Sequence, residues 1–249
     1  MRSLERSREA LTRDDRPSTF TMHGRAWDLL PEVFAPVYSP TTGFSMELLG
    51  LSDSVPKPRT GSMLEIGSGT GIIAVSSALA GCDRLVACDI NPAAVRNTAM
   101  NAARHGVGDR LRAVHSDLFT GLDVDERFDT IFWHSNYVLA PVDYAYRNVH
   151  ERAYVDPGYA THRRFLAAAP HWLTPGGSVL LHFSARGDLV SLLRIAGECD
   201  RELHMLRSIV FQEGEHEIEH MLIEVTAAPE RRNAHVQGRT EPVSRRTRP

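Results

Sequence analysis

The sequence predicts an α/β fold in which seven strands form a mostly parallel sheet, with helices on both faces and an antiparallel strand pair at its C-terminal end. Two observations predict it. From residue 61 onward, short apolar runs alternate with helical stretches, as in parallel sheets built from right-handed crossovers. The first run leads into the turn Gly67-Ser68-Gly69-Thr70-Gly71, and the second ends on Asp89. This order is typical of half a Rossmann-like nucleotide-binding unit.

Each expected element follows from a local pattern. Five apolar runs are expected to be parallel strands, at 63–66, 85–88, 111–115, 128–133 and 178–183. Helices are expected between them, at 71–80, 92–105, 159–173 and 188–199. Asn91 and Pro92 are typical of a helix cap and first turn, and Gly106 of a helix stop. The last two strands, 204–211 and 217–226, leave no room for a helix between them and should pair antiparallel.

Composition divides the chain into a main domain, 61–227, and flanking segments. Residues 1–20 are charged and lack periodicity, so we expect a flexible arm, and 21–60 should form a cap over cofactor and substrate. Within the main domain, 138–158 is too long and too aromatic for a plain connection, and we expect a substrate lid. The tail, 228–249, carries six arginines and should be disordered and solvated.

Charge and cysteine content exclude several classes of protein. The chain has 249 residues and a net charge of -3, which gives no reason to expect nucleic acid or an acidic membrane as partner. Its three cysteines lack metal-ligand spacing, so we expect reduced thiols and no metal site. There is no secretory signal and no run long enough to span a bilayer. We therefore expect a cytoplasmic protein; its oligomeric state stays open.

The register of the glycine turn indicates the kind of ligand. A dinucleotide loop needs a third glycine three residues after the second, but that position is Ile72, and the extra glycine is Gly71. Glu65 precedes the turn where a pyrophosphate would make a negative charge unfavourable. A ligand with a sulfonium and an amino-acid tail, and no phosphate, tolerates this carboxylate.

With these residues the chain resembles the class I S-adenosylmethionine-dependent methyltransferases. The resemblance covers about residues 35–226, and its motifs are Leu64-Glu65-Ile66-Gly67-Ser68-Gly69-Thr70-Gly71, Asp89-Ile90-Asn91-Pro92 and Ser116-Asp117-Leu118-Phe119. It implies S-adenosylmethionine as cofactor. The implied cofactor-binding residues are Glu65, Gly67, Ser68, Gly69, Thr70, Gly71, Asp89, Ile90, Asn91, Asp117, Leu118 and His134. Asp89 would accept from the ribose hydroxyls and Asp117 from the adenine amino group.

The acceptor motif departs from the family pattern. The chain resembles the small-domain subgroup that carries Asn-Pro-Pro-Tyr after the fourth strand, but it reads His134-Ser135-Asn136-Tyr137. Because the asparagine is replaced and both prolines are missing, an amide or base acceptor is not implied. His134, Asn136 and Tyr137 are the candidate catalytic residues, with His134 able to orient the acceptor or take its proton.

Further residues are expected to contact the substrate. They lie in the cap segment and the lid: Tyr38, Thr41, Thr42, Tyr144, Tyr146 and Tyr154.

We therefore expect a methyltransferase acting on a small-molecule acceptor, most simply by N-methylation of an amine or guanidine metabolite. Three alternatives stay open. The first is a protein or RNA methyltransferase, and the second is a protein that binds the cofactor without transferring methyl groups. A nicotinamide-dependent oxidoreductase is the third.

Overall fold

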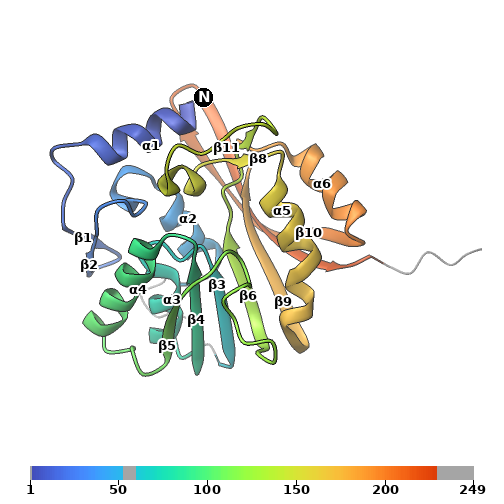
Figure 1. Ribbon diagram of the computed structural model, residues 1–249, viewed down its shortest axis with the longest axis horizontal. Helices are drawn as coiled ribbons and strands as arrows, with labels where there is room; N and C mark the ends of the chain where they lie inside the picture. The colour runs from blue at the N-terminus through green and yellow to red at the C-terminus, as the bar shows by residue number, and fades with distance from the viewer. Residues whose placement is uncertain (1, 53–59, 229–249) are drawn as a thin grey trace, which may run out of the picture.

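The computed structural model describes residues 2–52 and 60–228, apart from the side chain of Arg2. Seven strands form one sheet in the order β10-β11-β9-β6-β3-β4-β5 (Figure 1). Their bounds are β3 (Ser62–Ile66), β4 (Arg84–Asp89), β5 (Leu111–His115), β6 (Phe128–His134), β9 (Leu173–Ser184), β10 (Arg201–Glu213) and β11 (His216–Ala227). The central strands pair in parallel, and β11 is antiparallel to both β9 and β10. The predicted fold is confirmed.

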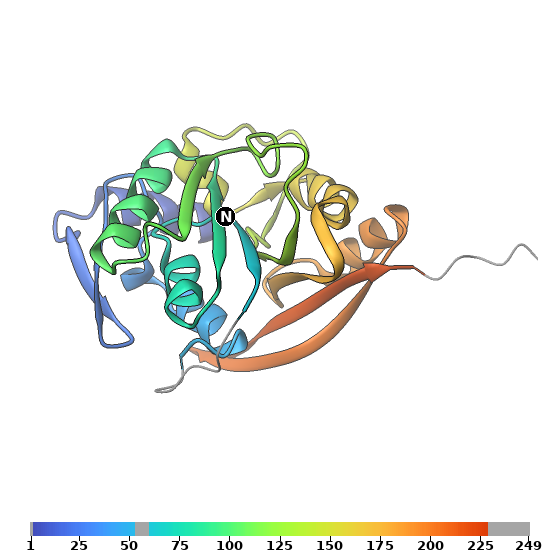
Figure 2. The same cartoon turned by 90° about the horizontal axis from the view of Figure 1, so that it is seen from below.

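Two helical layers enclose this sheet, because its strands bury side chains on both faces (Figure 2). Met63 and Leu85 belong to the hydrophobic cluster on one face, whereas Leu64 and Val86 belong to the cluster on the other. This alternation is the period of two expected for a strand. The first face is covered by α2 (Thr41–Leu48), α3 (Ile72–Leu79) and α4 (Pro92–Arg104); the second by α5 (Ala160–Ala168) and α6 (Leu189–Glu198).

Two elements differ from the sequence prediction around Pro170. The helix expected at 159–173 ends at Ala168 and continues as the 3-10 helix η3 (Ala169–Trp172), since a proline cannot continue the α-helical hydrogen bonding. The strand expected at 178–183 already begins at Leu173 as β9. Its pairing with β6 shifts register between Phe128 and Thr130, which accommodates the additional residues.

The N-terminal segment also differs from the expected flexible arm. Residues Arg2–Thr12 form helix α1, and a short hairpin of β1 (Thr19–Met22) and β2 (Arg25–Asp28) follows. Trp27 in this hairpin is buried and packs against the ring of His105 at the end of α4, with centroids 4.4 Å apart. The 3-10 helix η1 (Pro36–Tyr38) then leads into α2. The segment 53–59 and the arginine-rich tail 229–249 lie outside the described residues.

The expected lid, 138–158, contains only short elements. Strands β7 (Leu139–Ala140) and β8 (Asp156–Pro157) pair in parallel, and the 3-10 helix η2 (Val149–Ala153) lies between them. The carboxylate of Asp156 accepts the backbone N–H groups of Thr161 and His162, so the end of the lid caps the first turn of α5. The lid is thereby anchored to α5 at one end.

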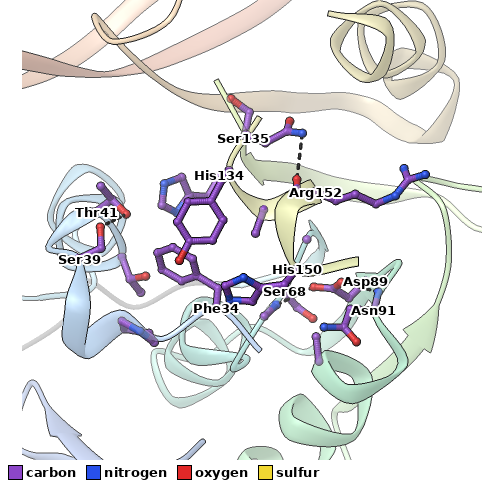
Figure 3. Close-up of a pocket in the computed structure, with 18 of the residues that line it drawn as sticks. Phe34, Ser39, Thr41, Ser68, Asp89, Asn91, His134, Ser135, His150 and Arg152 are labelled. Atoms are coloured by element: carbon purple, nitrogen blue, oxygen red, sulfur yellow. Dashed lines mark hydrogen bonds between the residues drawn. The ribbon is translucent and has the colours of Figure 1, made fainter. Parts of the chain in front are cut away.

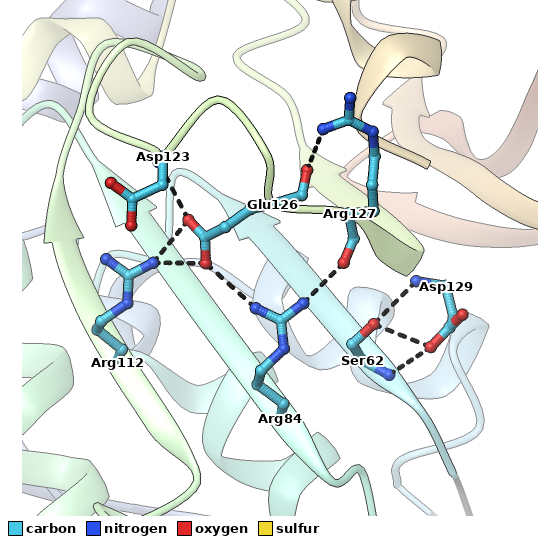
Figure 4. A network of polar contacts seen from close by, with 7 residues as sticks. All are labelled: Ser62, Arg84, Arg112, Asp123, Glu126, Arg127 and Asp129. Carbon is cyan, nitrogen blue, oxygen red and sulfur yellow. Dashed lines mark hydrogen bonds and ion pairs between the residues drawn. The ribbon is translucent and has the colours of Figure 1, made fainter. Parts of the chain in front are cut away.

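A polar network ties the strands together at the amino end of the parallel sheet, away from their carboxyl ends (Figure 4). Glu126 accepts hydrogen bonds from Arg84 on β4, at 3.1 Å, and from Arg112 on β5, at 2.7 Å. Asp129 on β6 accepts from the backbone N–H and the hydroxyl of Ser62 on β3. Because these charged groups are paired with one another, we assign this end of the sheet a structural role.

Candidate functional site

A cavity of about 490 Å³ lies at the carboxyl ends of the parallel strands (Figure 3). Ligands of open α/β sheets bind at this edge. Its lining comes from the ends of β3, β4 and β6, the segment 32–44, the lid, and α1. The cavity brings together most of the residues singled out in the sequence: Tyr38, Thr41, Thr42, Glu65, Gly67, Ser68, Gly69, Thr70, Asp89, Ile90, Asn91, Asp117, Leu118, His134, Asn136, Tyr137, Tyr146 and Tyr154.

The glycine turn begins where β3 ends and is tied to the neighbouring strand. The backbone N–H groups of Gly67 and Ser68 both donate to the carbonyl of Cys88, at 2.8 and 3.0 Å. Gly67, Gly69 and Gly71 all have positive φ, which glycine adopts at no steric cost. A Cβ on Gly69 would meet no protein atom within 4 Å, so the backbone here is open to a ligand.

Gly71 and Tyr144, two of the residues predicted to contact ligands, do not line the cavity. A Cβ on Gly71 would lie 2.9 Å from Cα of Thr98, so this glycine allows α3 and α4 to approach closely. The hydroxyl of Tyr144 donates to the carboxylate of Glu151 at 2.8 Å, within the lid. Both residues therefore support the structure around the cavity without lining it.

Asp89 ends β4 with its carboxylate at the cavity. One oxygen accepts the N–H of Gly69 and the other the N–H of Asn91, both at 2.8 Å. Burial raises the pKa of Asp89, and these two backbone hydrogen bonds act in the opposite direction. Each oxygen keeps a second lone pair. The carboxylate is therefore oriented by the turn it faces and can still accept two hydroxyl groups.

Glu65 lies on β3 beneath the turn and is 3% exposed. One carboxylate oxygen accepts the N–H of Ala74 in α3, at 2.9 Å. Burial raises the pKa of Glu65 well above its ordinary value, and the negative charge of Asp89 adds to this. A positive group in the cavity would reverse the effect, so this carboxyl group favours a cationic ligand.

The residues expected around an adenine ring are partly engaged in protein contacts. The Asn91 side chain accepts the N–H of Ala93 as the α4 cap and donates to the carbonyl of Glu32. Asp117 is paired with Arg164 at 3.0 Å. Leu118 has φ of 55°, a strained value for a branched residue, which turns the chain along the cavity wall.

His134 is the last residue of β6, and its ring stacks on His182 with centroids 4.3 Å apart. Among the residues that the structure describes, neither ring nitrogen of His134 has a hydrogen-bond partner. Burial lowers the pKa of His134 to about 3, and nearby His220 adds to the effect. The ring is therefore neutral at pH 7 and presents an accepting nitrogen.

Asn136 follows in the lid-forming turn and is held by two hydrogen bonds. Its amide nitrogen donates to the carbonyls of Arg152 and Val155, at 3.0 and 2.8 Å. Its Oδ1 is buried and has no partner among the described residues. A buried, unpaired carbonyl oxygen costs free energy unless a ligand satisfies it. Asn136 thus presents a second oriented acceptor.

Several cavity residues were not singled out by the sequence analysis: Phe34, Trp133, Arg186 and His220. His150, in η2, shares a hydrogen bond with Ser7 of α1, and its Nε2 is buried without a partner among the described residues. His220 reaches the cavity from β11, and Glu213 from the end of β10. No local motif marks His220, because only the pairing of β11 with β9 brings it to the cavity.

Helix α1 covers one side of the cavity, whereas the sequence predicted only a flexible arm for these residues. Ser3, Arg6 and Arg13 line the cavity, and Arg6 forms an ion pair with Glu213. Glu213 is also paired with Arg186. The negative charge of Glu213 is therefore neutralised by two guanidinium groups.

The residues present fit a nucleoside with a sulfonium and an amino-acid tail. The turn is open at Gly69, Asp89 has two free lone pairs, and Glu65 favours a cation. Three buried polar atoms of the lining, on Tyr38, Asn136 and His150, lack a partner among the described residues and therefore call for a ligand. The described residues contain no group of three or more His, Cys, Asp or Glu side chains that could hold a metal ion.

Comparison with known proteins identifies the family. The family model of ribosomal protein L11 methyltransferase (PrmA) matches residues 38–153. A putative protein N5-glutamine methyltransferase of Methanocaldococcus jannaschii is 33% identical over 156 residues, which are 61% of this chain and 75% of that protein. The chain belongs to the class I S-adenosylmethionine-dependent methyltransferases. S-adenosylmethionine is accordingly the cofactor of this methyltransferase.

Two further relatives match shorter parts of their own length. The release factor glutamine methyltransferase of Bordetella pertussis is 32% identical, over 59% of this chain and 56% of that protein. The ribosomal protein L11 methyltransferase of Pelotomaculum thermopropionicum is 41% identical over 58 residues, which are 23% of this chain and 19% of that protein. The methyltransferase thus spans about half of the first of these proteins and a fifth of the second.

Solved structures share the fold at low sequence identity. The tRNA m1G37 methyltransferase of M. jannaschii has a TM-score of 0.54 and 12% identity, over 85% of this chain and 57% of that chain. A putative tRNA (m1A22) methyltransferase of Streptococcus pneumoniae has a TM-score of 0.50 and 10% identity, over 76% and 72%. These likenesses concern the fold alone.

The relatives overturn the expected small-molecule acceptor and the expected small-molecule partner. Their names describe enzymes that act on ribosomal proteins, on a release factor and on protein glutamine. The alternative of a protein methyltransferase agrees with them, whereas methylation of an amine or guanidine metabolite does not. As for membranes, no helix among the described residues is long and apolar enough to cross one.

Proposed function

We propose that this methyltransferase transfers a methyl group to a side-chain nitrogen of a protein substrate, and that the nitrogen belongs to a carboxamide. The observation that carries this proposal is the composition of one end of the cavity, lined by His134, Asn136 and Glu213, which we call the acceptor end. His134 and Asn136 present neutral hydrogen-bond acceptors there, and the carboxylate of Glu213 is paired with Arg6 and Arg186. A neutral N–H donor is the complement of such a surface.

A cationic acceptor fits this end of the cavity less well. An ammonium or guanidinium group needs a free carboxylate close by, and the desolvation cost of burying an unpaired charge is high. Glu65 and Asp89, the buried carboxyl groups of the cavity, lie at the glycine turn instead. The relative that acts on protein N5-glutamine supports the same chemistry.

The cofactor is proposed to lie along the glycine turn. When bound, it supplies a methyl group activated by a sulfonium. Gly67 to Thr70 would pass beneath its amino-acid part, where Glu65 favours a positive group. Asp89 would accept the ribose hydroxyls, and Asp117, Ile90 and Leu118 would border the adenine.

The protein's contribution to the reaction is orientation and exclusion of water. His134 lines the cavity at the end of β6, and we propose that its neutral ring accepts a hydrogen bond from the acceptor N–H. Asn136 Oδ1 would accept a second one, because its amide group is held by two lid carbonyls. Tyr137 would form the wall behind the acceptor.

The cap segment and the lid are proposed to form the substrate entrance. Residues 21–60 would act as a cap and 138–158 as a lid, with Tyr38, Thr41, Thr42, Tyr146 and Tyr154 facing the substrate. Tyr146 donates to the carbonyl of Val155, so its ring is already held at the cavity wall. Helix α1 joins this assembly through Ser7 and His150.

The test uses the full chain, S-adenosylmethionine labelled in its methyl group, and three acceptor fractions from bacterial cells: nucleic-acid-free protein, total RNA, and small-molecule filtrate. We expect label in protein only. Hot acid hydrolysis should then release it as methylamine, because an N-methyl carboxamide is cleaved whereas an N-methylated amine is stable. Label confined to RNA or filtrate would contradict a protein substrate, and acid-stable label in protein would contradict the carboxamide.

A further inference from the structure

Three buried residues behind the acceptor end form a continuous chain of hydrogen bonds. Ser45 Oγ lies 2.6 Å from His182 Nδ1, and His182 Nε2 lies 3.0 Å from His220 Nδ1. Ser45 and His182 are fully buried, and His220 is 1% exposed. We call these three residues the histidine relay; they come from α2, β9 and β11.

Only the last member of the histidine relay lines the cavity. His220 is part of the cavity wall, whereas Ser45 and His182 are behind it. Because Nδ1 of His220 is engaged by His182, the other ring nitrogen, Nε2, is left without a partner among the described residues. The ring of Phe44 packs against His220 with centroids 4.8 Å apart and holds its orientation.

We propose that His220 is the residue that receives the proton released by the methylated nitrogen, and that His182 and Ser45 are positioning residues that fix its tautomer. This inference rests on the proposed carboxamide acceptor. In the competent state, His220 donates its Nδ1 proton to His182 Nε2, and His182 donates its Nδ1 proton to Ser45 Oγ. Nε2 of His220 is then unprotonated on the cavity side.

The proton balance of the reaction explains why such a residue is needed. The lone pair of the acceptor nitrogen forms a bond to the methyl carbon while the carbon–sulfur bond breaks, and its electron pair stays on sulfur. The nitrogen becomes cationic and releases its proton to Nε2 of His220, giving an imidazolium. Nδ1 of His220 still donates to His182, so the new charge is stabilised by a hydrogen bond in place.

The electrostatics of His220 suit a carboxamide. Burial lowers the pKa of His220 to about 4, and Arg186 adds to the effect. A base this weak takes a proton from an N-methylated carboxamide cation, which is a strong acid, but not from an alkylammonium. No hydrogen bond among the described residues fixes the tautomer of His134, whereas His182 fixes that of His220. We therefore assign the orienting role to His134 and the proton to His220.

The first arm of the test reads the tautomers directly. Long-range nitrogen–proton NMR spectra are recorded at pH 7 on the full chain labelled with 15N-histidine, with assignments from single variants. We expect His220 to carry its proton on Nδ1 and His182 on Nδ1, and Ser45→Ala to move the His220 proton to Nε2. A His220 proton on Nε2 in the unaltered protein would overturn the proposal, whatever the substrate.

The second arm measures single-turnover methyl transfer to the protein fraction. His220→Gln, which keeps a hydrogen-bonding side chain but cannot take a proton, should slow transfer by about 10²–10⁴-fold, the usual contribution of a general base. The dissociation constant for S-adenosylmethionine should stay within about twofold. His204→Gln is the matched control. His204 is an exposed histidine on β10 whose ring contacts the side chains of Thr226 and Glu202, outside the cavity lining. Transfer by His220→Gln at the unaltered rate would overturn the relay.

These arms separate the two proposals. If the unaltered enzyme labels no protein, the proposed function fails. The NMR measurement of the His182 and His220 tautomers still shows whether the histidine relay exists. If it labels protein and only His220→Gln is slow, both proposals are supported.

Discussion

Ser7 and His150 are 143 residues apart in the sequence, and their side chains share a buried hydrogen bond of 2.8 Å between Oγ and Nδ1. This bond fastens α1 to η2 in the lid. Ser7 is only 1% exposed, so this hydrogen bond is shielded from water. The N-terminal helix is thus part of the cavity wall.

Ser7→Ala should loosen α1 from the lid. It leaves Nδ1 of His150 buried without its partner, which costs about 1–3 kcal/mol. We expect faster tryptic cleavage at Arg13 and Arg16, measured under native conditions by mass spectrometry. Thr12→Ala is the control, because its exposed hydroxyl donates only to the carbonyl of Arg8 within the same helix. Equal cleavage rates for both variants would contradict a docked α1.

Asp89→Ala should weaken cofactor binding. The substitution removes the acceptor of the Gly69 and Asn91 N–H groups together with the two lone pairs proposed for the ribose. Since hydrogen bonds to charged groups contribute about 1.5–3 kcal/mol each, titration calorimetry should show at least a tenfold higher dissociation constant for S-adenosylmethionine. Asp109→Ala, an exposed carboxylate at the amino end of the sheet, should leave it unchanged. An unchanged constant in Asp89→Ala would remove the ribose role.

Gly71→Ala should destabilise the fold without touching the cavity lining. Its φ of 79° disfavours any side chain, and the new Cβ would lie 2.9 Å from the backbone of Thr98. We expect the free energy of unfolding in urea to fall by about 1–3 kcal/mol. Gly197→Ala in α6 has no atom within 4 Å of the added Cβ and should be neutral or stabilising. Similar losses in both variants would contradict this packing role.

Acidification should destabilise the protein below about pH 6.5, the ordinary pKa of histidine. Burial lowers the pKa of His150 and of His220 to about 4, and it also lowers the pKa of His162 and His182. The folded state keeps these rings neutral while the unfolded chain binds protons, so the free energy of unfolding falls as pH falls.

The loss should be of order 1–2 kcal/mol per buried histidine between pH 7 and 5. Urea unfolding at pH 7, 6 and 5 measures it. His150→Gln, which cannot titrate, should show a shallower pH dependence than the unaltered protein, whereas exposed His204→Gln should match it. A free energy that stays constant over this range would show that these rings bind protons equally in the folded and unfolded states, and so would contradict their lowered pKa values.

Much of the fold could be predicted because its signals are local. The turn at Gly67–Gly71, the Asn91 cap and the carboxylate of Asp89 each depend on neighbours within a few residues. Strand β5, Leu111–His115, was predicted residue for residue. The helix expected at 159–173 was wrong at its end, because Pro170 breaks it where an apolar pattern continues.

The acceptor end of the cavity could not be predicted in the same way. His182 and His220 sit in apolar strands whose pattern indicates only a buried sheet, and their pairing depends on β11 lying next to β9 in one register. Helix α1 reads as a charged arm because most of its residues are polar or charged, although it buries Ser7 and Ala10 on one face and bonds to the lid through Ser7 and His150.

The sequence by itself determined the fold class and the family, and it marked the glycine turn and Asp89 that we propose hold the cofactor, because close backbone approach and hydroxyl binding require particular residues at fixed short spacings. Only the tertiary structure decided the acceptor end. There, Asn136, His134 and His220 meet from separate elements, and the pairing of Glu213 with two arginines removes the charge that a cationic acceptor would need.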